Sequence, residues 1–194
     1  MFHIKSDIRS KKSAHLIYQA LLKLVATKSF EEITISDISR VSTVSRATFY
    51  RHFDDITDVF AWQNDLQLHE ILTSYVKLNH NKSTPDDLLS YLLENLLKES
   101  NLHSWKILLD IGRQDIIYTT FLNNAPILLD YFQSLGIYQE GSLTEYTYFI
   151  SIRVGFLIGI LNGWFRAGQK QTAEEVTSIV MKQHQEIIKS GKIF

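Results

Sequence analysis

The chain has 194 residues, of which 45% are hydrophobic and 21% are charged, with a formal net charge of -1. This composition is typical of a globular protein and excludes a disordered chain or a polycation. The absence of cysteine excludes disulfides, thiolate metal sites and cysteine nucleophiles, and it is compatible with a reducing compartment. The first residues lack the apolar stretch of a secretion signal, so we expect a cytoplasmic protein.

Charge is unevenly distributed along the chain. Residues 1–53 carry nine Lys and Arg against four Asp and Glu, a net charge of +5, whereas residues 54–194 carry eleven against seventeen, a net charge of -6. Neutralisation of phosphates supplies most non-specific affinity for nucleic acids, so the basic end is the candidate surface for a polyanion. A solvated basic surface without any partner is the alternative interpretation.

Apolar residues recur at steps of three and four along nearly the whole chain, which predicts an all-α fold with two unequal parts, residues 1–55 and 56–194. The first helix is expected at about Arg9–Lys28. Two short helices follow, at about Ile35–Val41 and Arg46–His52. Thr34, with Asp37 three residues later, is placed to cap the first of them, and Ser45 is placed to cap the second.

The helices of the second part are predicted from capping residues and helix breakers. Pro85 and Pro126 are both interpreted as first-turn residues, and Gly168 as a helix stop. The stretch from Gly136 to Gly141 is expected to be a loop. The expected helices are Asp55–Leu78, Pro85–Glu99, Ser104–Asp110, Gln114–Leu122, Pro126–Ser134, Leu143–Ala167, and a last one from the capping box Thr172–Glu175 to Gly191.

Residues 33–53, ITISDISRVSTVSRATFYRHF, have the organisation of a helix-turn-helix. Ile38 and Val41 are expected to be buried and Val44 to plug the turn, while Ala47 and Phe49 pack inward. The polar residues that begin the second helix are left for the major groove, where the fork of Arg46 matches the two acceptors of guanine. The last turn is expected to reach phosphates. The predicted DNA-binding residues are Lys11, Lys12, Thr34, Ser45, Arg46, Ala47, Thr48, Tyr50, Arg51 and His52. A three-helix unit without a role in DNA binding is the alternative.

This segment resembles the DNA-binding domain of the TetR/AcrR family of bacterial regulators from about Arg9 to Phe60, with residues 45–50 matching the recognition helix and Phe53 a buried closing aromatic. Two positions depart from the family pattern. Thr43 stands where the family usually has glycine, and a positive φ there is strained for threonine. Asp54 and Asp55 stand near where many members carry a lysine that contacts phosphate.

The resemblance implies a transcriptional regulator, most simply a repressor, with a helix-turn-helix head and a C-terminal ligand-binding and dimerisation domain. Such a protein binds a near-palindromic double-stranded DNA operator as a homodimer and is released by a small-molecule effector, here unidentified. The alternatives are an activator or co-regulator controlled by a protein partner, and a helical enzyme. The seven histidines show no metal-ligand spacing, and neither GxxxxGK[ST] nor GxSxG occurs, so we expect no catalysis, cofactor or metal.

Small residues fall four apart in the predicted helix 143–167 and permit close approach of another helix. The resemblance implies that the last two helices pair with those of a second subunit, although packing within one subunit is the alternative. The predicted dimer interface comprises Gly155, Gly159, Gly163, Val176, Ile179, Val180 and Ile187. The stretch from Tyr148 to Phe165 is also nearly long enough to span a bilayer, but Arg153 and Asn162 interrupt it, so we expect no membrane association.

The second part of the chain is rich in aromatic residues, most of which are expected to form its core. The resemblance implies a cavity among these helices for an effector, oriented by a few polar groups. The candidate ligand-binding residues are Asn95, Trp105, Arg113, Tyr118 and Phe156.

Overall fold

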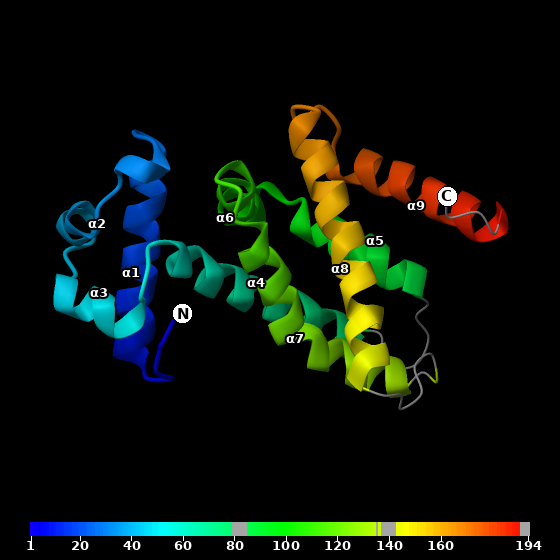
Figure 1. Ribbon diagram of the computed structural model, residues 1–194, viewed down its shortest axis with the longest axis horizontal. Helices are drawn as coiled ribbons and strands as arrows, with labels where there is room; N and C mark the ends of the chain where they lie inside the picture. The colour runs from blue at the N-terminus through cyan, green and yellow to red at the C-terminus, as the bar shows by residue number, and fades with distance from the viewer. Residues whose placement is uncertain (79–84, 135, 137–142, 191–194) are drawn as a thin grey trace.

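Helices form almost all the regular structure in the computed structural model, which describes residues 1–78, 85–134, 136 and 143–190. Outside the helices, the described residues include an isolated antiparallel bridge between Phe2 and Phe53. The all-α prediction is confirmed. Figure 1 shows a small head at one end, a larger body at the other, and one long helix that passes from the head into the body.

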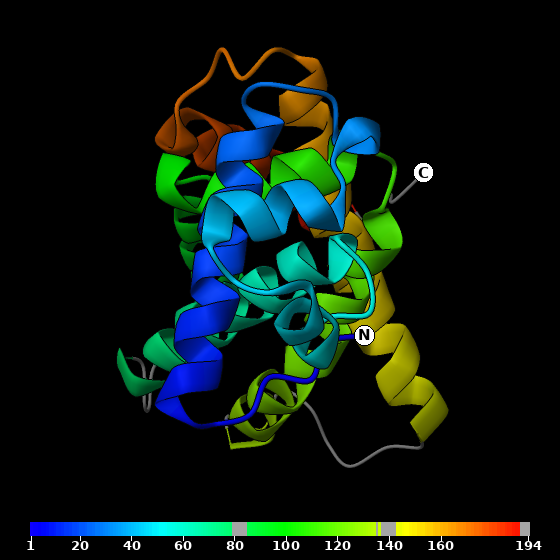
Figure 2. The same ribbon diagram turned by 90° about the vertical axis from the view of Figure 1, so that its left-hand side faces the viewer.

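The head contains α1 (Ile8–Val25), the 3₁₀ turn Phe30–Glu32, α2 (Ile35–Ser42) and α3 (Arg46–His52). Figure 2 looks onto this end of the molecule and shows α2 lying across α1, with α3 seen nearly end-on beside it. α1 begins one residue earlier than predicted because the Asp7 side chain accepts the N–H of Ser10. It ends before Lys28 because the N–H groups of Thr27 and Lys28 both turn back to the Leu24 carbonyl. The bounds of α3 agree with the prediction.

The core of the head comes from one stripe of α1 and from the inner faces of the two short helices. Its fully or nearly fully buried side chains are Ala14, Ile17, Leu21, Ile38, Phe49, Phe53, Val59 and Phe60. The last two belong to α4 (Thr57–Leu78), so the long helix is part of the head before it enters the body. Burying these apolar side chains fixes α3 relative to α1 and α4.

The body contains α5 (Pro85–Leu96), α6 (Glu99–Asp110), α7 (Gln114–Ser134), α8 (Leu143–Arg166) and α9 (Ala173–Ser190). In it, α4 packs on α6 and α7, α7 on α8, and α5 on α9. α6 begins five residues earlier than predicted, at Glu99, because α5 already ends at Leu96. The predicted loop at residues 136–141 lies, apart from Gly136, outside the described residues.

The predicted break of α7 before Pro126 is wrong, because a single helix continues through the proline. Proline lacks the N–H that would bond to the carbonyl four residues earlier, here that of Leu122. Both Leu122 and Pro126 are exposed, so this carbonyl is on the side of the helix that faces water. The opposite side buries Phe121 and Ala125, and this packing maintains one continuous helix.

α8 is long and apolar enough, over residues 145–166, to cross a membrane by length and composition. It packs on α7 through a buried stripe that contains Ile150, Val154, Leu157 and Leu161. A single helix of this kind is weak evidence for a membrane span, since core helices of globular proteins meet the same criteria. Arg153 lies in the middle of it, with its guanidinium 3.5 Å from the centre of the Phe149 ring.

Candidate nucleic-acid interface

The start of α2 is held by the predicted capping box. The Asp37 N–H donates to Thr34 Oγ1 at 3.2 Å, and the Thr34 N–H donates to Asp37 Oδ2 at 3.1 Å. Lys28 Nζ lies 2.7 Å from Asp37 Oδ2, and Arg40 Nη2 lies 2.7 Å from Asp37 Oδ1. The hydrogen bond from Lys28, followed by those from Thr34, holds the pKa of the Asp37 carboxyl well below its usual range. This end of α2 is therefore fixed at physiological pH.

The turn between α2 and α3 contains the left-handed residue that the comparison with the family pattern anticipated. Thr43 has φ +60° and ψ +12°. Its hydroxyl donates to the Ser42 carbonyl, and the Val44 N–H donates to Ser42 Oγ. Val44 is half-buried and packs against the core, as predicted for the plug of the turn. Thr43 thus adopts the left-handed conformation in spite of the steric cost of a threonine at positive φ.

α3 exposes one face and buries the other. Ser45 caps it by accepting the Thr48 N–H at 3.1 Å. The exposed face carries Arg46, Ala47, Tyr50 and Arg51, with Tyr50 52% exposed. Within the described part of the chain, the Arg46 guanidinium has no hydrogen bond or ion pair, so it is available to a ligand.

Two expectations about buried residues of this unit are wrong. Ala47 is exposed, because steps of three and four residues place it beside Tyr50 and Arg51 on the outer face of α3. Val41 is also exposed, because α2 turns Ser42, four residues after Ile38, into the interior in its place. Exposure of Ala47 keeps it compatible with contact to a base edge.

His52 does not occupy the surface position that was predicted for it. Its side chain is only 1% exposed, neither ring nitrogen has a hydrogen-bond partner, and burial lowers the pKa of the imidazole. The reason is tertiary, since the first residues of the chain cross the end of α3 and Phe2 pairs with Phe53. His52 is therefore not an exposed side chain at the end of α3, although it borders the hollow described next.

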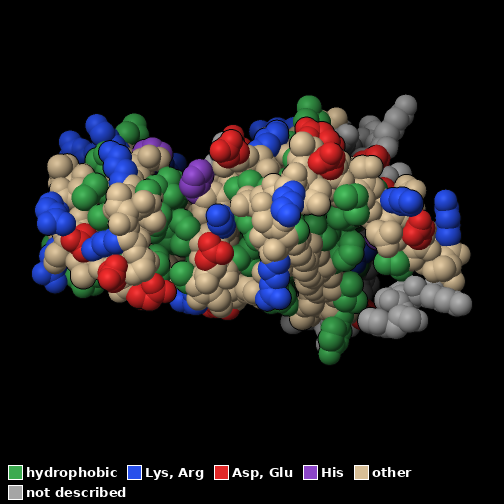
Figure 3. Space-filling view, turned by 90° about the horizontal axis from the view of Figure 1, so that it is seen from above, with side chains coloured by type: hydrophobic (Ala, Val, Ile, Leu, Met, Phe, Trp, Pro, Cys, Tyr) green, Lys and Arg blue, Asp and Glu red, His purple; other side chains and the backbone are tan. Residues whose placement is uncertain are grey.

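Beside this crossing, a hollow of about 280 Å³ lies between the first residues, the start of α1 and the end of α3. Lys5, Arg9 and Arg51 line it, together with Asp7, His3, His52 and two serines of α1. Lys5 and Arg9 were not among the predicted contacts, because no local pattern relates them to α3. Lys11 and Lys12 are exposed on α1 but do not line the hollow. Figure 3 shows Lys and Arg side chains gathered on this end of the molecule.

The five candidate ligand-binding residues do not share one cavity. Trp105 is buried in the core with its ring centre 5.8 Å from that of Phe121, and the Tyr118 hydroxyl is 2.6 Å from Ser151 Oγ. Phe156 lies on the outer face of α8 and contacts the His184 ring of α9. The expectation of a single cavity that joins these residues is thus not met.

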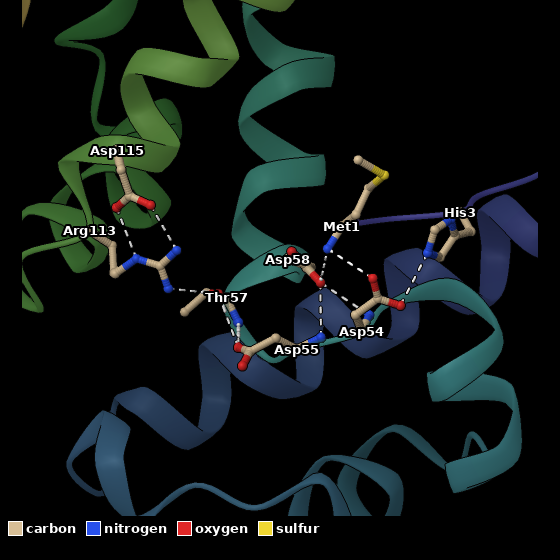
Figure 4. A network of polar contacts seen from close by, with 8 residues as sticks. All are labelled: Met1, His3, Asp54, Asp55, Thr57, Asp58, Arg113 and Asp115. Carbon is tan, nitrogen blue, oxygen red and sulfur yellow. Dashed lines mark hydrogen bonds and ion pairs between the residues drawn. The ribbon is translucent and has the colours of Figure 1, made fainter.

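The other two candidates lie at the surface, far apart along the fold. Asn95 lines a hollow of about 220 Å³ between α4, α5 and the start of α6. Arg113 lies before α7 at the junction of head and body, where it pairs with both carboxylate oxygens of Asp115 at 2.9 Å. It also donates to Thr57 Oγ1 at 3.4 Å, in the first turn of α4 (Figure 4). Arg113 is therefore placed to connect the body to the helix that leaves the head.

The glycines of α8 form an open strip on the surface of the subunit. A Cβ built at Gly155, Gly159 or Gly163 would meet no atom within 4 Å. Packing within one subunit, the alternative considered above, therefore does not explain them. Large apolar side chains flank the strip, with Ile152 69% exposed and Tyr148 also exposed.

The predicted residues of α9 separate into two groups. Ile179 is exposed, whereas Val180 and Ile187 are half-buried. Val176 is only 7% exposed, because it packs into the core of its own subunit where α9 lies on α5. Its assignment to a dimer interface was wrong. Among the described residues, no group of three or more His, Asp and Glu side chains is placed to hold a metal ion.

Comparison with known families explains the arrangement of the head. Residues 17–61 match the bacterial regulatory proteins of the tetR family. The chain carries a tetR-family DNA-binding domain. The match covers α1 from its middle, α2, α3 and the start of α4, so the exposed face of α3 lies within the matched DNA-binding domain. No curated protein matches the chain by sequence.

Solved structures extend the similarity of fold to the body of the chain. Lin0861 from Listeria innocua has a TM-score of 0.69 at 18% identity, covering 95% of this chain and 96% of that one. FadR from Bacillus halodurans, a fatty acid degradation regulator, has a TM-score of 0.56 at 15% identity, covering 89% and 93%. FadR from Bacillus subtilis, solved in complex with stearoyl-CoA, has a TM-score of 0.51 at 17% identity, covering 87% and 95%. At these identities the likeness establishes the fold alone.

Proposed function

We propose that the chain is a cytoplasmic, homodimeric repressor that binds a near-palindromic DNA operator through α3 and releases it when a small-molecule effector binds the body. The observation that supports this most directly is the exposed face of α3. Arg46, Tyr50 and Arg51 project from a helix whose other face is locked by the buried rings of Phe49 and Phe53. A rigid helix with polar and cationic side chains at its exposed start is what readout of the major groove requires.

The contacts are divided between base edges and phosphates. Arg46 reads a guanine through its fork, and Ala47 and Thr48 approach neighbouring bases. Tyr50 and Arg51 contact phosphates on the groove wall, joined by Lys5 and Arg9 across the basic hollow. Thr34 and Ser45, at the starts of α2 and α3, lie near the DNA backbone. Lys11 and Lys12 add sequence-independent electrostatic attraction along α1.

Dimerisation takes place on the open face of α8 together with exposed parts of α9. The glycine strip allows the partner's helix to approach closely, and the exposed Tyr148, Ile152 and Ile179 supply apolar area to be buried. Phe156 belongs to this surface rather than to an effector site. A two-fold dimer of this kind presents two recognition helices, which favours a near-palindromic operator.

Release by an effector is supported by the course of α4, which contributes to the core of the head and then packs along α6 and α7. A ligand that shifts these body helices also shifts α4, and the Arg113 bond to Thr57 connects the body to the first turn of that helix. FadR from Bacillus subtilis holds stearoyl-CoA in a protein of similar fold.

The experiment that tests the proposal is selection of bound fragments from a random double-stranded DNA library by the purified protein. We expect enrichment of one sequence with two inverted half-sites, and its loss when Arg46 and Arg51 are both replaced by alanine. A matched control replaces two surface cations far from α3, Lys98→Ala and Lys106→Ala, and should enrich the same sequence. Enrichment of no sequence by the folded wild-type protein would refute the function.

A further inference from the structure

The first residues of the chain make specific backbone contacts with the end of the recognition helix. Phe2 and Phe53 form an antiparallel bridge, and the His3 N–H donates to the His52 carbonyl at 2.8 Å. The Asp54 N–H, just beyond α3, donates to the carbonyl of the first residue at 3.2 Å. Residues 1–6, here termed the N-terminal segment, thus pair with the exit of α3 like a short strand.

The recognition helix needs such a partner because it is short. α3 has seven residues, and the last four carbonyls of any helix lack partners within the helix. Phe53 N–H satisfies the carbonyl of Phe49, whereas the carbonyl of His52 receives its bond from the N-terminal segment. A helix of two turns has little stability of its own, so the conformation of its last turn depends on these external contacts.

Side chains fasten the same segment to the start of α4 (Figure 4). The amine of Met1 lies 2.8 Å from Asp58 Oδ2 and 3.1 Å from Asp54 Oδ2, and His3 Nε2 lies 3.1 Å from Asp54 Oδ1. Asp58 Oδ2 also accepts the N–H groups of Asp54 and Asp55. Figure 4 shows these groups converging on the elbow between α3 and α4, so the segment spans the joint from one helix to the other.

The other end of the N-terminal segment is fixed as well. Asp7 accepts both the N–H and the hydroxyl of Ser10, which attaches the segment to α1. Phe2 and Ile4 pack against the core as half-buried side chains. Between these anchors the segment presents Lys5 to the hollow that Arg51 of α3 also lines. The segment is therefore built into the head and is not a free basic tail.

We propose that the N-terminal segment is a positioning element of DNA recognition, which caps the end of α3, fastens it to α4 and thereby holds Tyr50 and Arg51 at their phosphates. This inference rests on the proposed binding of DNA through α3. Phe2 and the backbone of His3 would thus contribute to DNA recognition by positioning α3, without contacting DNA themselves.

The test removes the single backbone donor that caps α3. Proline has no N–H, so His3→Pro eliminates the bond to the His52 carbonyl, while His3→Ala keeps it and removes only the half-exposed imidazole. We expect His3→Pro to weaken binding to the selected operator about 5- to 10-fold and His3→Ala no more than about twofold. Phe2→Ser should weaken operator binding as much as His3→Pro does, whereas Phe2→Leu should keep the affinity of the wild-type protein.

Two further measurements separate positioning from general loss of stability. Leu24→Ala destabilises the head from the far end of α1, and at a temperature where all variants are folded it should leave operator affinity within about twofold. Hydrogen exchange of the Phe53 amide should be about 5- to 10-fold faster in His3→Pro and unchanged in His3→Ala. Operator affinity that falls equally in His3→Pro and Leu24→Ala, or wild-type affinity of folded His3→Pro, overturns the proposal. If the wild-type protein selects no DNA, it is the proposed function that fails. Even then, an unchanged exchange rate of the Phe53 amide in His3→Pro would refute the proposal that the N-terminal segment caps α3.

Discussion

Replacement of Thr43 by glycine should stabilise the protein. Thr43 has φ +60° in the turn between α2 and α3, where a side chain with a Cβ is strained by about 1–2 kcal/mol. Glycine removes this strain but gains conformational freedom in the unfolded chain, which costs about 0.4–1 kcal/mol. The bond from the Thr43 hydroxyl to the Ser42 carbonyl joins neighbouring residues and is only partly buried, so its loss is small. The net expectation is a free energy of unfolding higher by about 0.5–1 kcal/mol.

Urea denaturation followed by circular dichroism measures this difference as a higher midpoint at an unchanged slope. Thr43→Ala is the matched control, because alanine also loses the hydroxyl and the branched side chain but keeps the strain of a Cβ at positive φ. It should lie close to the wild-type protein. If Thr43→Gly is no more stable than Thr43→Ala, the left-handed conformation is not the source of strain and the argument fails.

Three other outcomes are expected. Arg46→Ala should cost about 1–3 kcal/mol of operator binding and relax the preference at one base pair, whereas Tyr50→Phe should weaken all DNA sequences alike, as quantitative binding to a set of operator variants would show. Gly159→Leu should convert the dimer into a monomer in sedimentation at micromolar concentration, and an unchanged dimer would place the interface elsewhere. Burial lowers the pKa of His52 below its unfolded value, so the stability that its neutral form contributes is present above the ordinary pKa of histidine and is lost as the pH falls through the folded value. His52→Phe should therefore show a smaller loss of thermal stability than the wild-type protein when the pH is lowered from about 7.5 to about 5.5.

Local sequence was sufficient where neighbouring residues decide the structure. Ser45 and the Thr34–Asp37 pair predicted the two short helices, because a capping side chain bonds to an N–H three residues away in the same segment. The positive φ of Thr43 followed from the family resemblance instead, since the family usually has glycine at this position of the turn. The start of α9 followed from its Thr172–Glu175 box in the same way.

Local sequence failed where a partner distant along the chain decides the outcome. Pro126 has the signature of a helix start, yet α7 continues through it because the packing of Phe121 and Ala125 on the opposite face outweighs one missing hydrogen bond. Val176 fits the apolar stripe of an interface helix, but only the position of α5 determines that this valine is buried in its own subunit. Periodicity specifies an apolar face without specifying what covers it.

The sequence by itself therefore determined the all-α class, the helix-turn-helix and the exposed positions of Arg46, Tyr50 and Arg51 on α3, since each depends on capping and on the helical repeat. Only the tertiary structure placed residues 1–6 across the end of α3, buried His52 beneath them and brought Lys5 and Arg9 to Arg51. These contacts join positions more than 40 residues apart, and their energy comes from backbone pairing and apolar burial between segments whose local patterns are independent of one another.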